Sequence, residues 1–382
     1  MSADDVPIAP IQSYLEDLVA RDFSDGTVRS YAYALLRWWR WLRLHQCEWN
    51  QANPTLLCNF VLWLMTAKKP QSSARTLSKD TAGSINSVTG KMHLGDGYHP
   101  RTIRHSNAVI RSFYTYTIET GTGPLLNPVQ LARSGTRSNA HHNVLEDFRP
   151  SGRIRYNPPL PKRRPRTMND KQWRDVFAAL GSNRDRAILA IALSNGARAS
   201  EILGIKGADI DWGEQLVRVI RKGSRDEQWL PISAESMIWL RLYLNERDHV
   251  TPGDSVWQTV RKRSRGSTLT YRPLSYEALR AVFRRLNTIL GTNWSMHDLR
   301  HTAALRMSRD KNLTLQDLQT ILGHRNLQTT IEVYLHEADT ATAVKVLEHL
   351  STYGPPPTAT TPTAPSRYAP DDLDILFGRN RS

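Results

Sequence analysis

The chain of 382 residues is 40% hydrophobic and carries a formal net charge of +15, a combination typical of two or three globular domains that bind a polyanion such as nucleic acid. Its two cysteines, Cys47 and Cys58, argue against a secreted protein held together by disulfides and predict reduced thiols. No apolar run approaches the ~18–20 residues of a membrane span and no signal peptide opens the chain, so we expect a cytoplasmic protein with no membrane partner.

Residues 9–125 are predicted to be helical. Between residues 31 and 42, tyrosine, leucine and tryptophan side chains recur at helical spacing, and arginines occupy the other positions. Two more helices are expected at 54–67 and 101–120. Residues 70–99 are rich in Ser, Thr and Gly and lack periodicity, which predicts a long loop between helices.

Residues 126–166 are predicted to connect two domains. Prolines keep the run 152–166 extended, and this run has six positive charges and no acidic residue. It is either a solvated linker or a strap that lies on DNA phosphates. The residues that would contact DNA in the second case are Arg153, Arg155, Lys162, Arg163, Arg164 and Arg166.

Residues 167–355 combine helical patterns with two short apolar runs. The runs 216–220 and 228–232 flank the turn-like sequence Gly223-Ser224-Arg225-Asp226 and predict a β-hairpin, whereas the sequence from Ala234 onward is expected to be mostly helical. The predicted fold is therefore mainly α with a small antiparallel β-sheet in the second domain. The predicted organisation is an N-terminal extension (1–8), a helical domain (9–125), a basic linker (126–166), a second domain (167–355) and a Pro/Thr-rich spacer with a tail (356–382).

Two arginines of the second domain are candidates for binding a phosphate group. A phosphodiester resists nucleophiles because its charge repels them, so a catalyst must neutralise the non-bridging oxygens in the transition state. Arginine suits this task because its planar fork donates two parallel hydrogen bonds and stays charged. The candidates are Arg198 and Arg300, with structural ion pairing as the alternative. Glu201, three residues after Arg198, is expected to orient a neighbouring cation.

A pair of histidines accompanies the second arginine. His297 and Arg300 are three residues apart and share one face of a predicted helix. His301 follows His297 by four residues, a spacing that also suits zinc. Position 298 is Asp rather than the Glu of a zinc protease motif, and no cysteine lies near, so we expect no metal.

A third histidine and a tyrosine follow. Gly323 predicts the end of a helix that begins after Thr314, His324 lies in the turn, and Tyr334 is ten residues further. By itself such a tyrosine would be assigned to a core. With Lys222 of the predicted hairpin, however, the set supplies phenol, guanidinium, imidazole and ammonium groups. That combination suits attack on a phosphodiester, because each group has a distinct task there.

Four motifs of the second domain match a known family in combination. They are Gly196-Ala197-Arg198-Ala199-Ser200-Glu201, His297-x-x-Arg300, Leu322-Gly323-His324 and Tyr334. The chain thereby resembles the tyrosine recombinases, also called the phage integrase family, and Lys222 stands where that family keeps its hairpin lysine. Residues 9–125 resemble the family's helical core-binding domain, and because they begin so near the N-terminus we expect no separate arm-binding domain before them. Ala197 departs from the pattern, since a larger apolar residue is common there.

The resemblance implies a reaction and no cofactor. Tyr334 would attack the scissile phosphate to form a 3′-phosphotyrosyl link, and Lys222 would protonate the departing 5′ oxygen as general acid. The two arginines would stabilise the transition state, while His297 and His324 position groups or exchange protons. The covalent link keeps the bond energy, so the 5′ hydroxyl of a partner strand can reverse the step.

The resemblance also implies an assembly on double-stranded DNA target sites. The family forms a two-domain, C-shaped clamp around duplex DNA and works as a homo-tetramer in the synaptic complex, so we expect a monomer free in solution that assembles on DNA. Accessory DNA-bending or directionality factors are further expected partners. The tail at 356–382 is predicted to dock on a neighbouring protomer, with a disordered tail as the alternative.

Two other functions stay open from the sequence. A type IB topoisomerase uses the same phosphoryl chemistry but relaxes one duplex without synapsis; the core-binding domain and the motif spacing argue against it. A non-catalytic DNA-binding protein could keep the fold, but it would have no use for a phenol together with a leaving-group acid.

Overall fold

The computed structural model describes residues 7–70, 81–132, 152–160, 166–247, 250–261, 263–265 and 268–323, together with Val346 and His349. The chain forms two compact units. They are Met1–Arg163 with Gly291–Asn293, and Arg164–Leu290 with Trp294–Ser382. None of the helices in these described stretches is both long and apolar enough to span a membrane.

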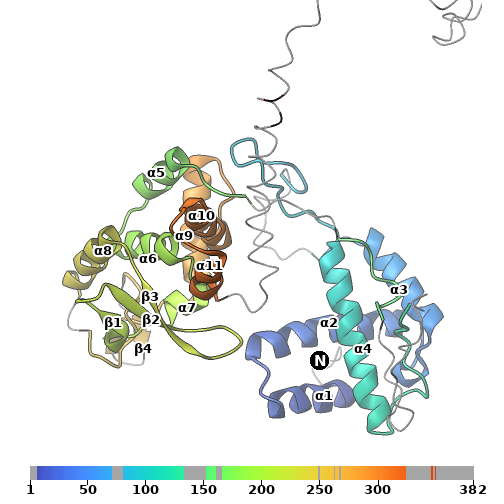
Figure 1. The fold of residues 1–382 in the computed structure, drawn as a ribbon. Helices are drawn as coiled ribbons and strands as arrows, with labels where there is room; N and C mark the ends of the chain where they lie inside the picture. Colours follow the sequence, from blue (N-terminus) through green and yellow to red (C-terminus); the bar gives the residue numbers. More distant parts are fainter. Residues whose placement is uncertain are drawn as a thin grey trace, which may run out of the picture. The chain divides into compact units, whose positions relative to one another are not determined.

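The first unit is built on four helices, the blue to cyan segments of Figure 1. They are α1 (Ala9–Ala20), α2 (Asp25–Leu44), α3 (Pro54–Thr66) and α4 (Pro100–Glu119). Helix α4 contacts the other three. Proline at the first position of α3 and of α4 fixes a helical φ where no backbone donor is needed, and the Ser24 hydroxyl caps α2. The helices predicted at 54–67 and 101–120 are confirmed.

Aromatic side chains make up much of this unit's core. Trp38, Phe60 and Tyr114 are each at most 1% exposed. Trp38 donates its indole N–H to the Tyr114 hydroxyl at 3.0 Å, and that hydroxyl donates to the Trp49 carbonyl at 2.8 Å. The polar tips of these large side chains are therefore satisfied inside an apolar core, which removes the cost of burying them.

Two described stretches of the predicted connector, 126–132 and 152–160, lie on the first unit. Leu131 pairs with Ile154 in an isolated bridge, and Asn107 of α4 donates to the Tyr156 carbonyl at 3.1 Å. The exposed side chains of Arg153 and Arg155 therefore project from backbone that is held in place.

The other elements of the second unit pack around one buried helix, α6. Its helices are α5 (Asp170–Ala178), α6 (Asn183–Asn195), α7 (Ala199–Leu203), α8 (Ala234–Asn245), α9 (Tyr276–Leu290), α10 (Met296–Arg309) and α11 (Leu315–Leu322). Its strands are β1 (Ile210–Asp211), β2 (Leu216–Ile220), β3 (Glu227–Pro231), β4 (Arg263–Arg265) and β5 (Thr268–Thr270). Helix α6 contacts α8, α10 and β3, and it is apolar around most of its circumference, as expected for a helix covered on several sides.

A small antiparallel sheet in the order β1-β2-β3 completes this unit. Val217 and Val219 of β2 point into the core, and Val217 pairs with Leu230 of β3. The predicted hairpin and the mainly helical fold class are confirmed. The second hairpin, β4–β5, lies in a region expected to be helical. Its strands of three residues are too short to show the alternation that reveals a strand in a sequence.

Candidate active site

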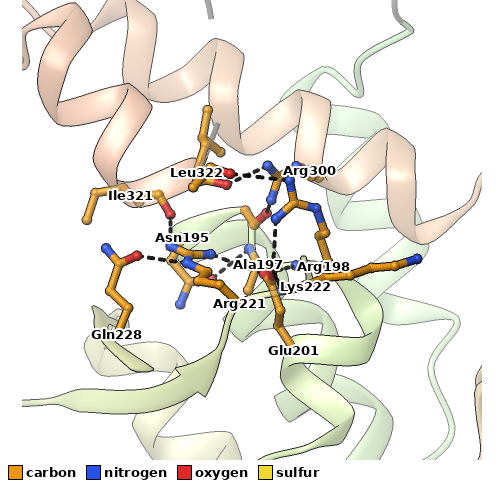
Figure 2. Close-up of polar contacts among 12 residues, drawn as sticks. Asn195, Ala197, Arg198, Glu201, Arg221, Lys222, Gln228, Arg300, Ile321 and Leu322 are labelled. Carbon is orange, nitrogen blue, oxygen red and sulfur yellow. Dashed lines mark hydrogen bonds and ion pairs between the residues drawn. The ribbon is translucent and has the colours of Figure 1, made fainter. Parts of the chain in front are cut away.

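The site forms where α7, α10, the β2–β3 turn and the end of α11 meet within the second unit (Figure 2). Helix α6 ends at Gly196, whose φ of +67° is accessible to glycine at little cost. A Cβ atom there would lie 2.7 Å from Cδ2 of Leu322, so the close approach of α11 also requires glycine. The sharp turn at Gly196 places Arg198 at the start of α7, facing the end of α11.

Glu201 is the anionic centre of the site. Its side chain is 0% exposed, and its Oε1 accepts from the Arg198 guanidinium at 2.8 Å. Its Oε2 accepts from the Arg221 guanidinium at 3.1 Å, and the backbone N–H groups of Arg198 and Lys222 donate to the same carboxylate. Burial alone would raise the Glu201 pKa. The hydrogen bonds from Arg198 and the charges of both arginines outweigh it, and the pKa lies below its ordinary value.

Arg300 reaches the site from α10 and is 5% exposed. It donates to the Gly196 carbonyl at 2.7 Å and to the Leu322 carbonyl at 2.6 Å. A guanidinium has five N–H donors, and these two carbonyls use two of them. Burial, and then the nearby charge of Arg198, lower the pKa of Arg300 to about 10.

Arg221 belongs to the site although the sequence analysis did not select it. It lies just after β2, is 5% exposed, and donates to Glu201, to Gln228 of β3 and to the Ile321 carbonyl of α11. A signal was present in the sequence. The alternation that buries Val217 and Val219 continues to position 221, so an arginine there faces inward and requires partners.

The C-terminal end of α11 is the surface on which the three arginines converge. Arg221 donates to the carbonyls of Thr320 and Ile321, Arg300 donates to that of Leu322, and Arg198 donates to that of Gly323 at 3.4 Å. The last carbonyls of a helix have no partner within the helix and carry partial negative charge. Guanidinium groups therefore fix the position of this helix end, which leads directly to position 324.

The charges of the site do not balance. Among the residues that the structure describes here, three guanidinium groups face one carboxylate, which leaves a net charge of +2, and the exposed Lys222 lies beside them. Such a site is suited to an anion with several oxygens, such as a phosphate, because arginine forks match that geometry.

An anion should therefore stabilise the protein. Folding lowers the pKa of Arg300 to about 10, so folding disfavours its charge; this cost is fully present below pH ~10 and is relieved as the pH rises above that value. At ten times its Kd, inorganic phosphate would add about 1.4 kcal/mol, or about 3–5 °C in the melting temperature of the second unit. Calorimetry against sodium chloride of equal ionic strength measures the shift. An equal shift in Arg300→Met would contradict binding at this site.

The structure brings together four of the residues predicted from the sequence: Arg198, Glu201, Lys222 and Arg300. His297 is exposed in the first turn of α10, with its ring centroid 4.4 Å from that of His301. The predicted residues that lie outside the described part of the chain are His324, Tyr334, Lys162, Arg163 and Arg164. Arg166 is described, is exposed and belongs to the second unit.

Comparison with known proteins places this chain in a family. Residues 166–341 match the model of the phage integrase family, and residues 11–82 match that of the phage integrase N-terminal SAM-like domain. The chain belongs to the phage integrase family. It is a tyrosine-type site-specific DNA recombinase, as the four sequence motifs had indicated.

The relatives of this recombinase include a transposase and a Xer protein. Transposase A from transposon Tn554 of Staphylococcus aureus is 24% identical over 342 residues, which cover 87% of this chain and 88% of the relative. Tyrosine recombinase XerD of Ralstonia nicotianae is 32% identical over 185 residues, 47% of this chain and 58% of the relative. A Tn1549 transposon integrase, solved with circular intermediate DNA, shares the fold with a TM-score of 0.55 at 15% identity, over 85% of this chain and 94% of that one.

Proposed function

We propose that this recombinase cleaves and rejoins DNA by reversible transesterification through a 3′-phosphotyrosyl intermediate, with Tyr334 as the nucleophile. The observation that carries the proposal is the convergence of Arg198 and Arg300 beside Lys222, with the buried carboxylate of Glu201 paired to Arg198. Preorganised positive charge of this kind stabilises the charge that develops on the non-bridging oxygens in the transition state.

Each remaining group has a task in the same step. As Tyr334 attacks the phosphorus, the bond to the 5′ oxygen breaks, and Lys222 gives that oxygen a proton. Its exposure suits a group that must reach DNA from a turn. His297 and His324 position groups or exchange protons, and Glu201 orients Arg198. The bond energy stays in the phosphotyrosyl link, so the proposal requires no nucleotide or other cofactor.

We further propose duplex DNA as the partner. Similar solved structures include a transposon integrase in complex with circular intermediate DNA and an integrase dimer bound to a core site. In this chain, Arg153 and Arg155 are exposed on the first unit and Arg166 on the second. Together with Lys162, Arg163 and Arg164 they would contact phosphates and set position rather than sequence preference. Because DNA is the proposed partner, the proposed location of the protein is the cytoplasm.

The proposed assembly exchanges strands between two duplexes, as a homo-tetramer formed from monomers on DNA. In this proposal residues 9–125 are the core-binding domain, 126–166 the linker and 167–355 the catalytic domain. The segment 356–382 would dock on a neighbouring protomer, and accessory factors would set the direction of the reaction. Recombination is favoured over single-duplex relaxation because residues 11–82 match the family's N-terminal SAM-like domain and the relatives include a recombinase and a transposase.

A nicked suicide duplex tests the proposal, because loss of a short fragment traps the covalent intermediate. Duplexes tiled across the DNA that flanks the gene are incubated with the protein in EDTA, and a denaturing gel then separates protein–DNA adducts. We expect an adduct for one duplex and recombination between two plasmids that carry it. Relaxation of a supercoiled plasmid without recombination would instead indicate a topoisomerase. Specific binding of a duplex without any adduct would indicate a non-catalytic protein.

A further inference from the structure

Arg221 combines a buried side chain with a position beside the proposed general acid. It is the residue before Lys222, in the turn that follows β2, yet it is 5% exposed while Lys222 is exposed. Burial of an arginine is costly unless its donors are paired, and burial is the main reason that the pKa of Arg221 is lowered. Its contacts therefore have to be strong enough to hold it in place.

Those contacts join three elements. Toward the sheet, Nε donates to the Gln228 side chain of β3 at 2.7 Å. Toward α7, Nη1 donates to Glu201 at 3.1 Å. Toward α11, Nη2 donates to the Ile321 carbonyl, and Gln228 itself donates to the Thr320 carbonyl at 3.1 Å. Figure 2 shows Arg221 between these partners, with Lys222 leading away from them.

The fit at the helix end leaves little freedom. Gly323, with a φ of +59°, ends α11, and a Cβ atom there would lie 2.9 Å from Nε and 3.0 Å from Cζ of Arg221. The Arg221 guanidinium therefore lies directly against the residue that precedes position 324. A planar, forked cation can serve the carboxylate, the amide and the helix carbonyls together, whereas a lysine ammonium is a point charge on a flexible stem.

A lysine in an exposed turn samples many orientations, and catalysis requires it to hold one. The backbone N–H of Lys222 donates to Glu201 Oε1 at 3.3 Å, and Arg221 holds Oε2 of the same carboxylate. The turn is thus anchored at its first residues. We propose that Arg221 is a positioning residue that ties this turn to α7 and α11 and thereby sets the reach of Lys222 toward the leaving oxygen.

This inference rests on the proposed role of Lys222, and a sulfur leaving group tests it. Suicide duplexes carry either the normal 5′ oxygen or a bridging 5′ sulfur at the scissile phosphate. A thiol has a pKa near 8.5, so the thiolate leaves without a proton and needs no general acid. In each case the tyrosyl oxygen–phosphorus bond forms as the phosphorus–oxygen or phosphorus–sulfur bond breaks. The measurement is the single-turnover rate of adduct formation.

With the oxygen substrate we expect Arg221→Met to cleave about 10–100 times more slowly than wild type and Lys222→Ala about 100 times or more. The sulfur substrate should bring both to within about threefold of wild type, but should not restore Arg198→Met, whose defect lies in charge stabilisation. Arg221→Lys should cleave the oxygen substrate at an intermediate rate. Arg218→Met is the matched control and should cleave normally: Arg218 lies on β2, which leads into this turn, and forms ion pairs with Asp209 and Glu227.

Circular dichroism and DNA affinity confirm that each variant is folded and binds. If Arg221→Met fails to fold, Gln228→Met is used in its place. The Gln228 substitution removes one hydrogen-bond partner of Arg221 and leaves the ion pair between Arg221 and Glu201 intact. The inference would be overturned if the Arg221 variant cleaved both the oxygen and the sulfur substrate slowly. It would also be overturned if that variant cleaved the oxygen substrate at the wild-type rate. Absence of an adduct with the wild-type protein on both substrates would instead refute the proposed function.

Discussion

The Tyr334→Phe variant should bind its target duplex with wild-type affinity and form no covalent adduct with it. The substitution removes one oxygen atom, and that atom is the proposed nucleophile, so no other group in the site can take its place. The DNA contacts proposed for the linker and the arginine cluster are unchanged. We therefore expect complete loss of the adduct on a nicked suicide duplex and an unaltered gel shift.

Tyr276→Phe is the matched control for this experiment. Tyr276 lies at the start of α9, is 54% exposed, and belongs to the same unit as the site. Its substitution makes the same chemical change away from the arginine cluster and should leave adduct formation intact. An adduct trapped with Tyr334→Phe would show that a different residue attacks the phosphate. Equal losses in both variants would point to damage of the fold.

Glu201→Gln should have the second largest effect, and it should appear in both stability and cleavage. The carboxylate is fully buried and accepts four hydrogen bonds, and removing its charge takes the anionic partner from both Arg198 and Arg221. Breaking a buried ion pair by removing one partner costs about 3–5 kcal/mol. We expect the free energy of unfolding of the second unit to fall by that amount in urea titrations. Cleavage should fall as well, because Arg198 and Arg221 lose their common partner.

The contribution of Glu201 to the stability of the folded state depends on pH in a defined direction. Its folded-state pKa is below that of the unfolded chain, so the stabilisation is fully present above pH ~4.3 and is lost as the pH falls through the folded pKa. The difference in stability between wild type and Glu201→Gln should therefore shrink in acid. Glu227→Gln is the control: Glu227 pairs with Arg218 at 62% exposure, and its loss should change stability by no more than about 0.5 kcal/mol. A similar loss of stability in Glu201→Gln and Glu227→Gln would contradict this role of Glu201.

Much of this recombinase is determined by local sequence. The prolines at 54 and 100 start helices, Thr314 and Gly323 bound α11, and alternating valines define β2, because capping, turn and burial preferences act within a few residues. The motif residues Arg198 and Arg300 were recognisable for the same reason. Their types and spacings along the chain suffice to predict a site for phosphodiester chemistry.

The tertiary structure alone decided how the site is held together. Arg221 finds its partners 20 residues away in α7 and about 100 residues away in α11, and no local pattern contains such pairings. Likewise, the sequence could not show that Arg300 holds the end of α11 by the Leu322 carbonyl. Side-chain periodicity predicts which residues face inward, but the partner that a buried charge meets depends on which elements pack together. The excess of guanidinium charge at one helix end is a product of that packing.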